Sequence, residues 1–562
     1  GVPANISNGT LLSGSGNGAY DLVVQQYNIG GLNISAGIAD NGANATSLTK
    51  AGPGILNLTG VNTFTGATYV NGGGLAIQNA SALGSTSGIS VVAGGALQIS
   101  NGITLAKALT LQGDGIAADG ALRSTSGTNT SSGTITLGSS ARVSADYGAS
   151  LALTSATSIT GTGYNLAASG EGNTIINSAI ATGAAASLIK YDGGTLTLNS
   201  SSANTFNGGL CINGGTLLLD FANLSAASNL VNSGNGLGID SGVLLIKGNP
   251  AAATTTQTLG NVTKAAGAGR ILIDPANVSG TTTLTLGTLV TNTSDNYNNP
   301  AGGTLLLGKA AGASGSAVIT STTGTLVNGI YGGRVAYTSD GGTTVDWATS
   351  ASGSTPYTLG SYSGYTTLPT SSLVSTTNYS TTGTTLAASG SGNTLKLLDS
   401  GALNLGAQTL TLTTGGLLAT GSAAATISNG TLTAGNASGL YELLVHQYNT
   451  GGLTVSGTIA NNGGNATVLT KSGPGALVLT NANSYTGATY VNEGVVNIQN
   501  ATALGTTAGG VIACGTTAPV SAASLPAATA SSKRTRRPQA GQDAAFCHAA
   551  KSKSAPQAGH LS

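Results

Sequence analysis

The sequence has 562 residues, of which 89 are glycine, 6% are charged and 4% are aromatic, and its formal net charge is +1. A helical protein needs charged residues and leucine at helical spacing, and collagen needs glycine at every third position, so neither class fits. The hydrophobic fraction of 40% supplies a core and excludes a disordered chain. The near-neutral charge points to no nucleic acid partner, and the absence of methionine favours a processed chain or a fragment. The remaining class is rich in β-strands and tight turns.

The chain opens on a module that returns near its end. Residues 6–84 recur at 427–505 with an offset of 421, and about 50 of the 79 positions are identical. A looser copy of part of this module, with a two-residue insertion before Asn204, occupies residues 188–220. The same unit is therefore used three times, with its most regular parts at residues 48–84, 188–220 and 469–505.

A shorter repeat underlies the modules. A glycine followed by alternating apolar residues returns at steps of mostly 19 to 27 residues, as at Gly54, Gly74 and Gly95. Each unit is a turn followed by a short strand, which cannot bury its own apolar face, so neighbouring units must stack. Leucine-rich repeats would need helical returns, and no helical periodicity is visible. The pattern predicts an all-β, right-handed parallel β-helix with coils of about 20 residues. The residues expected to point inward are Leu56, Leu58, Leu198, Leu477 and Leu479.

Two segments depart from this pattern. Residues 331–365 form an irregular, aromatic-rich segment. From residue 516 onward the alternation stops, and prolines and the basic cluster Lys533–Arg537 follow. Proline removes a donor from a β-ladder, and stacked like charges repel each other. We therefore expect a β-helix over residues 1–515 and a disordered basic tail over residues 516–562.

Three stretches of the chain resemble a known family. Lys50 to Gly73 reads K-x-G-P-G-x-L-x-L-T-x-x-N-x-F-T-G-A-T-Y-V-N-x-G, Lys471 to Gly494 has the same pattern with Tyr for Phe, and Lys190 to Gly215 follows it more loosely. This pattern resembles the passenger-associated transport repeat of bacterial autotransporters, also called the autotransporter-associated β-strand repeat. The resemblance implies a secreted β-helical passenger domain at the extracellular surface of a bacterium, whose repeats assist export and folding. From the stacked coils we expect a monomeric rod. The resemblance also implies a partner outside this chain, an outer-membrane barrel or other secretion machinery, and a role as a surface stalk or adhesin with surface glycans as the candidate target.

An enzyme is the main alternative, because parallel β-helices also include polysaccharide lyases and glycosidases. Such sites need paired carboxylates for acid–base chemistry or Ca²⁺. The 17 acidic residues are scattered, and the closest pairs, Asp114 with Asp119 and Asp340 with Asp346, are typical turn residues. We predict no catalytic residue, no cofactor and no metal site. A carbohydrate-binding module remains a second alternative.

One histidine and three lysines occupy matching positions of the modules. His446 stands where the first module has Gln25, so the module does not depend on an imidazole. Lys50, Lys190 and Lys471 share one position before a turn. We interpret them as solvated corner lysines that keep the sheet edge soluble; the alternative is a docking point for secretion partners.

The best candidate for a ligand patch is the aromatic-rich segment, because aromatic rings form platforms for sugars. The alternative is packing of a loop against the β-helix. The residues of this candidate patch are Tyr337, Trp347, Tyr357, Tyr362 and Tyr365.

Overall fold

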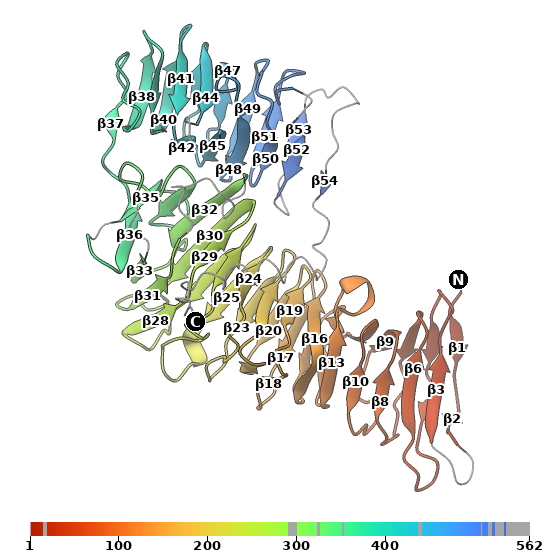
Figure 1. The fold of residues 1–562 in the computed structure, drawn as a ribbon. Coiled ribbons are helices and arrows are strands. Elements are labelled where there is room, and N and C mark those ends of the chain that lie inside the picture. Colours follow the sequence, from red (N-terminus) through yellow and green to blue (C-terminus); the bar gives the residue numbers. More distant parts are fainter. Residues whose placement is uncertain are drawn as a thin grey trace, which may run out of the picture. The chain divides into compact units, whose positions relative to one another are not determined.

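In the computed structural model the chain is almost entirely β-structure (Figure 1). The structure describes residues 2–14, 20–289, 301–322, 326–350, 353–435, 441–506, 509–514, 520–522 and 533–534. The chain divides into two compact units, Gly1–Asn235 and Gly236–Ser562. Two 3-10 turns, η1 (Ile116–Ala118) and η2 (Phe221–Asn223), are the helical elements of the described residues.

Unit 1 is a stack of coils whose strands pair in parallel with the coils before and after. The larger sheet of this unit contains β1 (Ala4–Ile6), β3 (Asp21–Gln25), β4 (Leu32–Ile34), β6 (Ser47–Ala51), β7 (Ile55–Leu58), β8 (Thr68–Val70), β9 (Gly73–Ile77), β10 (Ile89–Val91), β11 (Gly95–Ile99), β13 (Leu109–Gly113), β14 (Leu122–Ser124), β16 (Ile135–Ala145), β18 (Ile159–Thr160), β19 (Leu166–Ser169), β21 (Ile180–Ala181), β22 (Ser187–Lys190) and β24 (Gly209–Ile212). Successive strands of one coil, β10 and β11, pair with successive strands of the next, β13 and β14, so this sheet covers two faces of the stack.

The third face of unit 1 is a second parallel sheet. It contains β12 (Thr104–Leu105), β15 (Thr128–Ser131), β17 (Ser150–Leu153), β20 (Asn173–Ile176), β23 (Thr195–Leu198) and β25 (Thr216–Asp220). A separate pair, β2 (Thr10–Leu11) with β5 (Gly37–Ile38), is also parallel. The predicted parallel β-solenoid is confirmed, and its coils have roughly 24 residues, slightly more than expected.

Inward side chains form continuous aliphatic rows across the coils. Leu56 is paired with Leu32 in the coil before and with Leu75 in the coil after, and Leu75 is paired with Leu97. Full burial of such a side chain stabilises the fold by roughly 1.5–3 kcal/mol. The five leucines predicted to point inward are all at most 1% exposed, which confirms that prediction: Leu56, Leu58, Leu198, Leu477 and Leu479.

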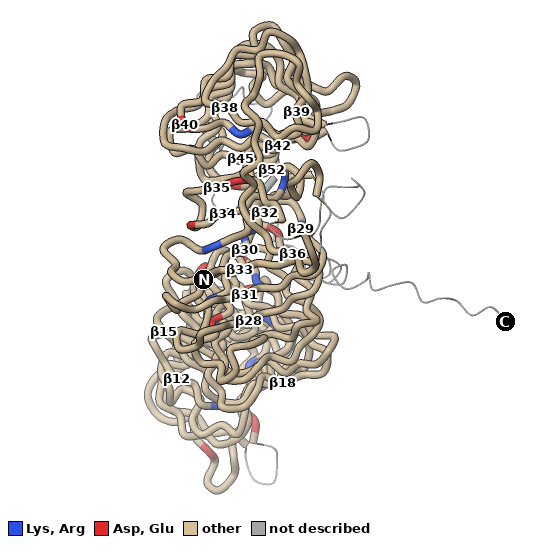
Figure 2. Tube along the Cα trace, turned by 90° about the vertical axis from the view of Figure 1, so that its left-hand side faces the viewer, with Lys and Arg blue, Asp and Glu red and all other residues tan. Residues whose placement is uncertain are grey.

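Outward positions carry polar ladders instead. The Asn57 amide donates to the Asn33 side-chain oxygen at 2.8 Å, and the Asn33 amide donates to that of Asn5 at 2.8 Å. Neutral amides can stack in this way at the strand spacing of about 4.8 Å, whereas like charges would repel. Charged residues are accordingly sparse along the trace (Figure 2).

Unit 2 contains two solenoid stretches. The first, residues 237–361, contains β26 (Leu237–Ile239), β27 (Val243–Lys247), β28 (Thr254–Thr258), β29 (Val262–Lys264), β30 (Gly267–Asp274), β31 (Thr281–Leu286), β32 (Gly303–Lys309), β33 (Ser316–Ser321), β34 (Val335–Thr338), β35 (Val345–Ser350) and β36 (Tyr357–Ser361). Pairing in this stretch is parallel up to β34 and becomes antiparallel at β34–β35, β35–β36 and β33–β36. The irregular aromatic segment is thus the place where the parallel stack of this stretch ends.

The second stretch begins at β37, and its strands pair in parallel. It contains β37 (Thr366–Thr367), β38 (Asn378–Thr385), β39 (Gly390–Gly392), β40 (Thr394–Asn404), β41 (Thr409–Leu412), β42 (Gly416–Thr420), β43 (Ala425–Ser428), β44 (Thr431–Ala434), β45 (Glu442–Gln447), β46 (Leu453–Val455), β47 (Thr458–Ile459), β48 (Val468–Ser472), β49 (Ala476–Leu479), β50 (Thr489–Val491), β51 (Val495–Ile498), β52 (Val511–Ala513), β53 (Val520–Ala522) and β54 (Lys533–Arg534). Strands β45 and β48 of this stretch lie beside β32 of the first stretch (Figure 1), and Arg334, which directly precedes β34, pairs with Glu442 of β45.

Most of the tail expected over residues 516–562 lies outside the described residues. Two short strands are described within it: β53 pairs with β51, and β54 pairs with β52, both in parallel. Parallel pairing therefore extends past residue 515 at these two places. The boundary at residue 515 and the disorder of the tail stay predictions.

Candidate functional site

The repeated lysine is an internal clamp. Lys50 is the penultimate residue of β6, and its side chain turns into the stack, where it is fully buried. Its ammonium group donates to the carbonyl oxygens of Ala51 at 3.0 Å, Gly52 at 2.8 Å and Gly72 at 2.9 Å. The first two acceptors belong to the turn that follows the lysine, and the third belongs to the turn of the next coil. One side chain therefore closes one turn and ties it to the next.

The lysine of the third repeat builds the same clamp, and the lysine of the middle repeat closes its own turn in the same way. Lys471 is fully buried and donates to Ser472 and Gly473 of its own turn, and to Glu493 of the next coil at 2.9 Å. Lys190 is 2% exposed and donates to the carbonyl oxygens of Tyr191 and Asp192. The interpretation of these residues as solvated corner lysines is wrong. A buried ammonium needs acceptors, and the glycine-rich turn supplies them because its carbonyl groups point inward.

Burial dominates the electrostatics of the clamp. It lowers the pKa of Lys50 to about 8 and that of Lys190 to about 8. The pKa of Lys471 falls to about 7 through burial, although the Glu493 carboxylate works in the opposite direction. Removing a charged group from water disfavours its charged form, and this effect outweighs the nearby carboxylates.

A fourth clamp was missed in the sequence. Lys264 ends β29, is 4% exposed, and donates to the carbonyl oxygens of Asp240 at 2.9 Å and of Ala265. Burial lowers the pKa of Lys264 to about 8. Its turn reads A-A-G and lacks the G-P-G pattern. The signal that could have found it is a lone lysine at the end of an alternating strand, just before a glycine-containing turn.

An asparagine in each repeat bridges three coils. The Asn62 side-chain oxygen accepts a hydrogen bond from Ile38 N at 2.7 Å, and its amide donates to Ala82 O. Ile38 lies 24 residues before Asn62, and Ala82 lies 20 residues after it. Both groups of the side chain are thus used, one toward each neighbouring coil.

The same bridge recurs in the other repeats. Asn204 accepts from Ile180 N at 2.8 Å and donates to Leu230 O at 2.8 Å. Asn483 accepts from Ile459 N at 2.7 Å and donates to Ala503 O at 2.6 Å. The aromatic residue two positions later in each copy is fully buried: Phe64, Phe206 and Tyr485. The N-x-[FY] pattern, constant in all three copies, is the signal that could have identified these asparagines.

The candidate ligand patch is only partly at the surface. Trp347 is fully buried, and its ring packs edge-on against His446 with ring centroids 5.3 Å apart. Tyr337, Tyr357, Tyr362 and Tyr365 are partly buried. Trp347 thus cannot touch a ligand, and the patch stays a prediction for the four tyrosines.

Two of these tyrosines are held in place by polar contacts. The Tyr362 hydroxyl donates to Gly364 O at 2.7 Å, and the Tyr365 hydroxyl donates to the Asp346 carboxylate at 3.1 Å. Asp346 also pairs with Lys396, whose ammonium lies 5.3 Å from the centre of the Tyr365 ring. The segment is therefore packed by its aromatic rings and fixed by one ion pair.

The carboxylates considered for catalysis have structural partners. Asp114 pairs with Arg142 at 3.3 Å, and Asp119 pairs with Arg123 at 3.0 Å. Asp340 accepts hydrogen bonds from the backbone N–H groups of Thr343 and Thr344 at 3.0 and 2.8 Å. These contacts are those of ion pairs and of a turn. Among the described residues, no group of three His, Cys, Asp or Glu side chains is arranged to hold a metal ion.

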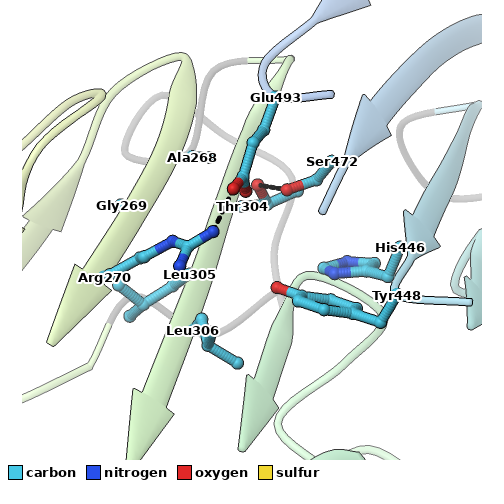
Figure 3. Close-up of a pocket in the computed structure, with 10 residues that line it drawn as sticks. All are labelled: Ala268, Gly269, Arg270, Thr304, Leu305, Leu306, His446, Tyr448, Ser472 and Glu493. Carbon is cyan, nitrogen blue, oxygen red and sulfur yellow. Dashed lines mark hydrogen bonds and ion pairs between the residues drawn. The ribbon is translucent and has the colours of Figure 1, made fainter. Parts of the chain in front are cut away.

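The stretches of unit 2 meet at a polar contact, which we call the seam: β30, β32 and β34 on one side and β45, β48 and β50 on the other. Arg334 pairs with Glu442, and both side chains are at most 4% exposed. Arg270 pairs with Glu493, and the Thr304 hydroxyl donates to the Ser472 hydroxyl at 2.8 Å (Figure 3). Buried charges are tolerated here because each meets an opposite charge.

A crevice in the seam holds His446 and Tyr448, whose rings lie side by side opposite Leu306 and Arg270 (Figure 3). The crevice is too narrow to admit a water molecule, so it has no room for a small-molecule ligand. Burial lowers the pKa of His446 to about 4, although its ring nitrogen lies 3.0 Å from Gly333 O. A neutral, buried imidazole in a crevice of this size is a packing element of the seam.

In the part of the chain that the structure describes, no helix is long and apolar enough to cross a membrane. Comparison with curated proteins and with solved structures finds no match for this chain.

A comparison with protein families finds one match, repeated three times. The model of the passenger-associated-transport-repeat family matches residues 48–77, 188–219 and 469–498. Each match begins just before a clamp lysine and includes the bridging asparagine and the buried aromatic residue. In this chain each repeat therefore supplies the same three structural features: a clamp lysine, a bridging asparagine and a buried aromatic ring. The chain carries three passenger-associated transport repeats on a parallel β-solenoid, as an autotransporter passenger domain does.

Proposed function

We propose that this chain is a non-catalytic passenger, exported to the bacterial surface, where it acts as a stalk or adhesin-like element. The observation that carries the proposal is the clamp of the three repeats. The clamps of Lys50 and Lys471 join groups of their own coil and the next, as Lys50 joins Gly52 and Gly72, and Lys190 closes its own turn. A coil can therefore close as soon as about one further coil is available.

This locality suits a chain that folds while it emerges through a membrane. Closing a loop of about 20 residues costs little entropy, and each closed coil presents a template for the next. The repeats thereby support export and folding. Secretion machinery outside this chain would be the partner.

Surface display tests the proposal. In cells that export the protein, Lys50→Met with Lys471→Met should lower the amount of protease-accessible protein at the surface several-fold. Lys107→Met is the matched control, because Lys107 is partly exposed and lies outside the three repeats. Equal display of the double variant and the control would contradict an export role for the clamps.

The absence of catalysis is tested with the substrates of β-helical enzymes. Incubation with pectin, alginate and common β-glycans should release no products. Turnover that disappears in Asp340→Asn or Asp346→Asn would instead assign a polysaccharide-active enzyme.

Adhesion is tested on a glycan array. We propose that the four tyrosines of the patch contact the glycan, since Trp347 is buried: Tyr337, Tyr357, Tyr362 and Tyr365. Binding that is lost in Tyr362→Ala would support the adhesin-like role, and the absence of any binding would leave the stalk role.

A further inference from the structure

One face of the repeated module is exposed in the first copy, in unit 1, and buried in the second copy, in unit 2. On β3 of the first module, Val23 is 50% exposed and Tyr27, which follows the strand, is 69% exposed. Their counterparts at the offset of 421, Leu444 and Tyr448, are 1% and 6% exposed. We call the outward side of β3, β6 and β8, with Tyr27, the open face of the first module.

The counterpart of the open face is covered by the Arg334-bearing sheet, β30–β32–β34. Arg334 pairs with Glu442, and His446 contacts Gly333 O. The Asn492 amide, from the end of β50, donates to Gly302 O at 2.6 Å. Leu306, Ala336 and Trp347 pack against Tyr448 in one hydrophobic cluster.

The open face keeps the groups that make this contact. Asp21 replaces Glu442, and the Thr49 hydroxyl donates to its carboxylate at 2.9 Å, as Thr470 does to Glu442. The amide of Gln25 can donate to a carbonyl oxygen in place of His446. Asp21 and Gln25 are both exposed, and Asp21 has no basic partner among the described residues.

Tyr69 and Asn71 complete the open face. Tyr69 is 43% exposed, and Asn71, the counterpart of Asn492, is exposed. One charged contact is missing, because Gly72 stands where the second module has Glu493. Exposed apolar side chains gathered around a carboxylate mark an interaction surface, and the carboxylate calls for a basic partner.

Unpaired polar atoms weaken the covered contact. Four buried polar atoms in or beside the seam have no hydrogen-bond partner among the described residues: Arg334 Nε, Trp347 Nε1, Asn492 Oδ1 and Glu493 Oε2. Burying each of these atoms without a partner costs free energy, because water would hydrogen-bond to it if the contact opened. The contact is weaker by this amount.

We propose that the open face is a docking surface for the Arg334-bearing sheet of a second copy of this chain. In this exchange, the sheet leaves the second module of its own copy and packs on the open face of the other copy. Asp21 takes the place of Glu442 opposite Arg334, and Tyr27 takes the place of Tyr448. The second module competes with a high effective concentration, because it belongs to the same chain. Exchange between equivalent elements therefore becomes visible when the intramolecular contact is weakened.

Charge reversal tests this proposal by sedimentation of the full chain. Glu442→Arg places a cation opposite Arg334 and opens the seam. The variant should sediment with at least twice the mass of the wild type at equal concentration. Adding Asp21→Arg should return it to the mass of the wild type. A folded Glu442→Arg chain that does not associate, or whose association persists with Asp21→Arg, would overturn the proposal.

A crosslinking measurement serves if Glu442→Arg does not fold, and it uses the milder variant Glu442→Gln, which weakens the contact by removing the ion pair with Arg334. A benzophenone side chain is placed at position 27, and isotope-labelled and unlabelled copies are mixed at high concentration. Crosslinks between copies to peptides of β32 or β34 support the exchange. Crosslinks elsewhere, or none between copies, overturn it.

Discussion

The ammonium group of Lys50 lies 2.9 Å from the carbonyl oxygen of Gly72, which belongs to the next coil. Lys471 has the same relationship to Glu493, at 2.9 Å. A lysine in the core of a solenoid would ordinarily be costly, because its charge leaves water. Here its three donors meet three carbonyl oxygens, and two of them, Gly52 O and Gly72 O, have no other donor among the described residues.

Lys50→Met should destabilise unit 1. Methionine replaces the aliphatic stem but leaves the carbonyl groups of Gly52 and Gly72 without a donor, whereas Ala51 O still accepts from Gln26 N at 2.8 Å. Each orphaned carbonyl costs about 1–3 kcal/mol, and relief of the buried charge offsets part of this, so we expect a net loss of about 2 kcal/mol. Urea unfolding measures the change, with Lys107→Met as the control. An unchanged midpoint for Lys50→Met would show that the clamp contributes nothing to stability.

Asn483→Ala should lower the stability of unit 2 by more than the loss of a small side chain would suggest. It removes the acceptor of Ile459 N and the donor to Ala503 O, which leaves two backbone groups of neighbouring coils unpaired. The expected loss is about 2–4 kcal/mol. Hydrogen exchange should show faster exchange at the Ile459 amide in particular. Asn44→Ala, at an exposed turn, is the control and should leave exchange at Ile459 unchanged.

His446 makes unit 2 sensitive to acid. Burial lowers the pKa of His446 from 6.5 to about 4. Between these two pH values the unfolded chain binds a proton at this imidazole and the folded chain does not. The stability from this group is complete above pH 6.5 and is lost as the pH falls toward 4, by about 3 kcal/mol. His446→Gln should abolish this loss, since the first module already uses Gln25 at this position. Unfolding curves of both proteins between pH 7 and 4 should diverge; parallel curves would contradict the assignment.

The basic tail should be the first part of the chain that trypsin removes. Its prolines interrupt a β-ladder, and its neighbouring cations would repel each other in a stacked coil. We expect early cleavage within Lys533–Arg537 and a resistant body, measured by mass spectrometry of the digest. The described pairing of β54 with β52 gives the opposite outcome a clear meaning, because resistance at Lys533 would show that the coils continue through it.

The repeats and the inward leucines could be predicted from the sequence, since both depend on local order. A period-2 strand after a glycine turn has one apolar face, and that face must lie inward whatever the neighbours are. Leu56 and Leu477 are therefore buried in both modules. The burial of the Lys50 side chain could not be predicted in this way. Lysine is usually solvated, and only the inward carbonyl groups of two successive turns make its burial favourable.

The solvent exposure of the outward residues depends on the tertiary structure alone. Val23 and Leu444 occupy the same position of the same module, yet Val23 is 50% exposed and Leu444 is 1% exposed. The local sequence fixes which side of a strand points outward. Whether that side meets water or another sheet depends on segments more than a hundred residues away, as the contact of Arg334 with Glu442 shows. Hydrophobic periodicity carries no information about such distant partners, because it reports only the direction of each side chain from its own strand.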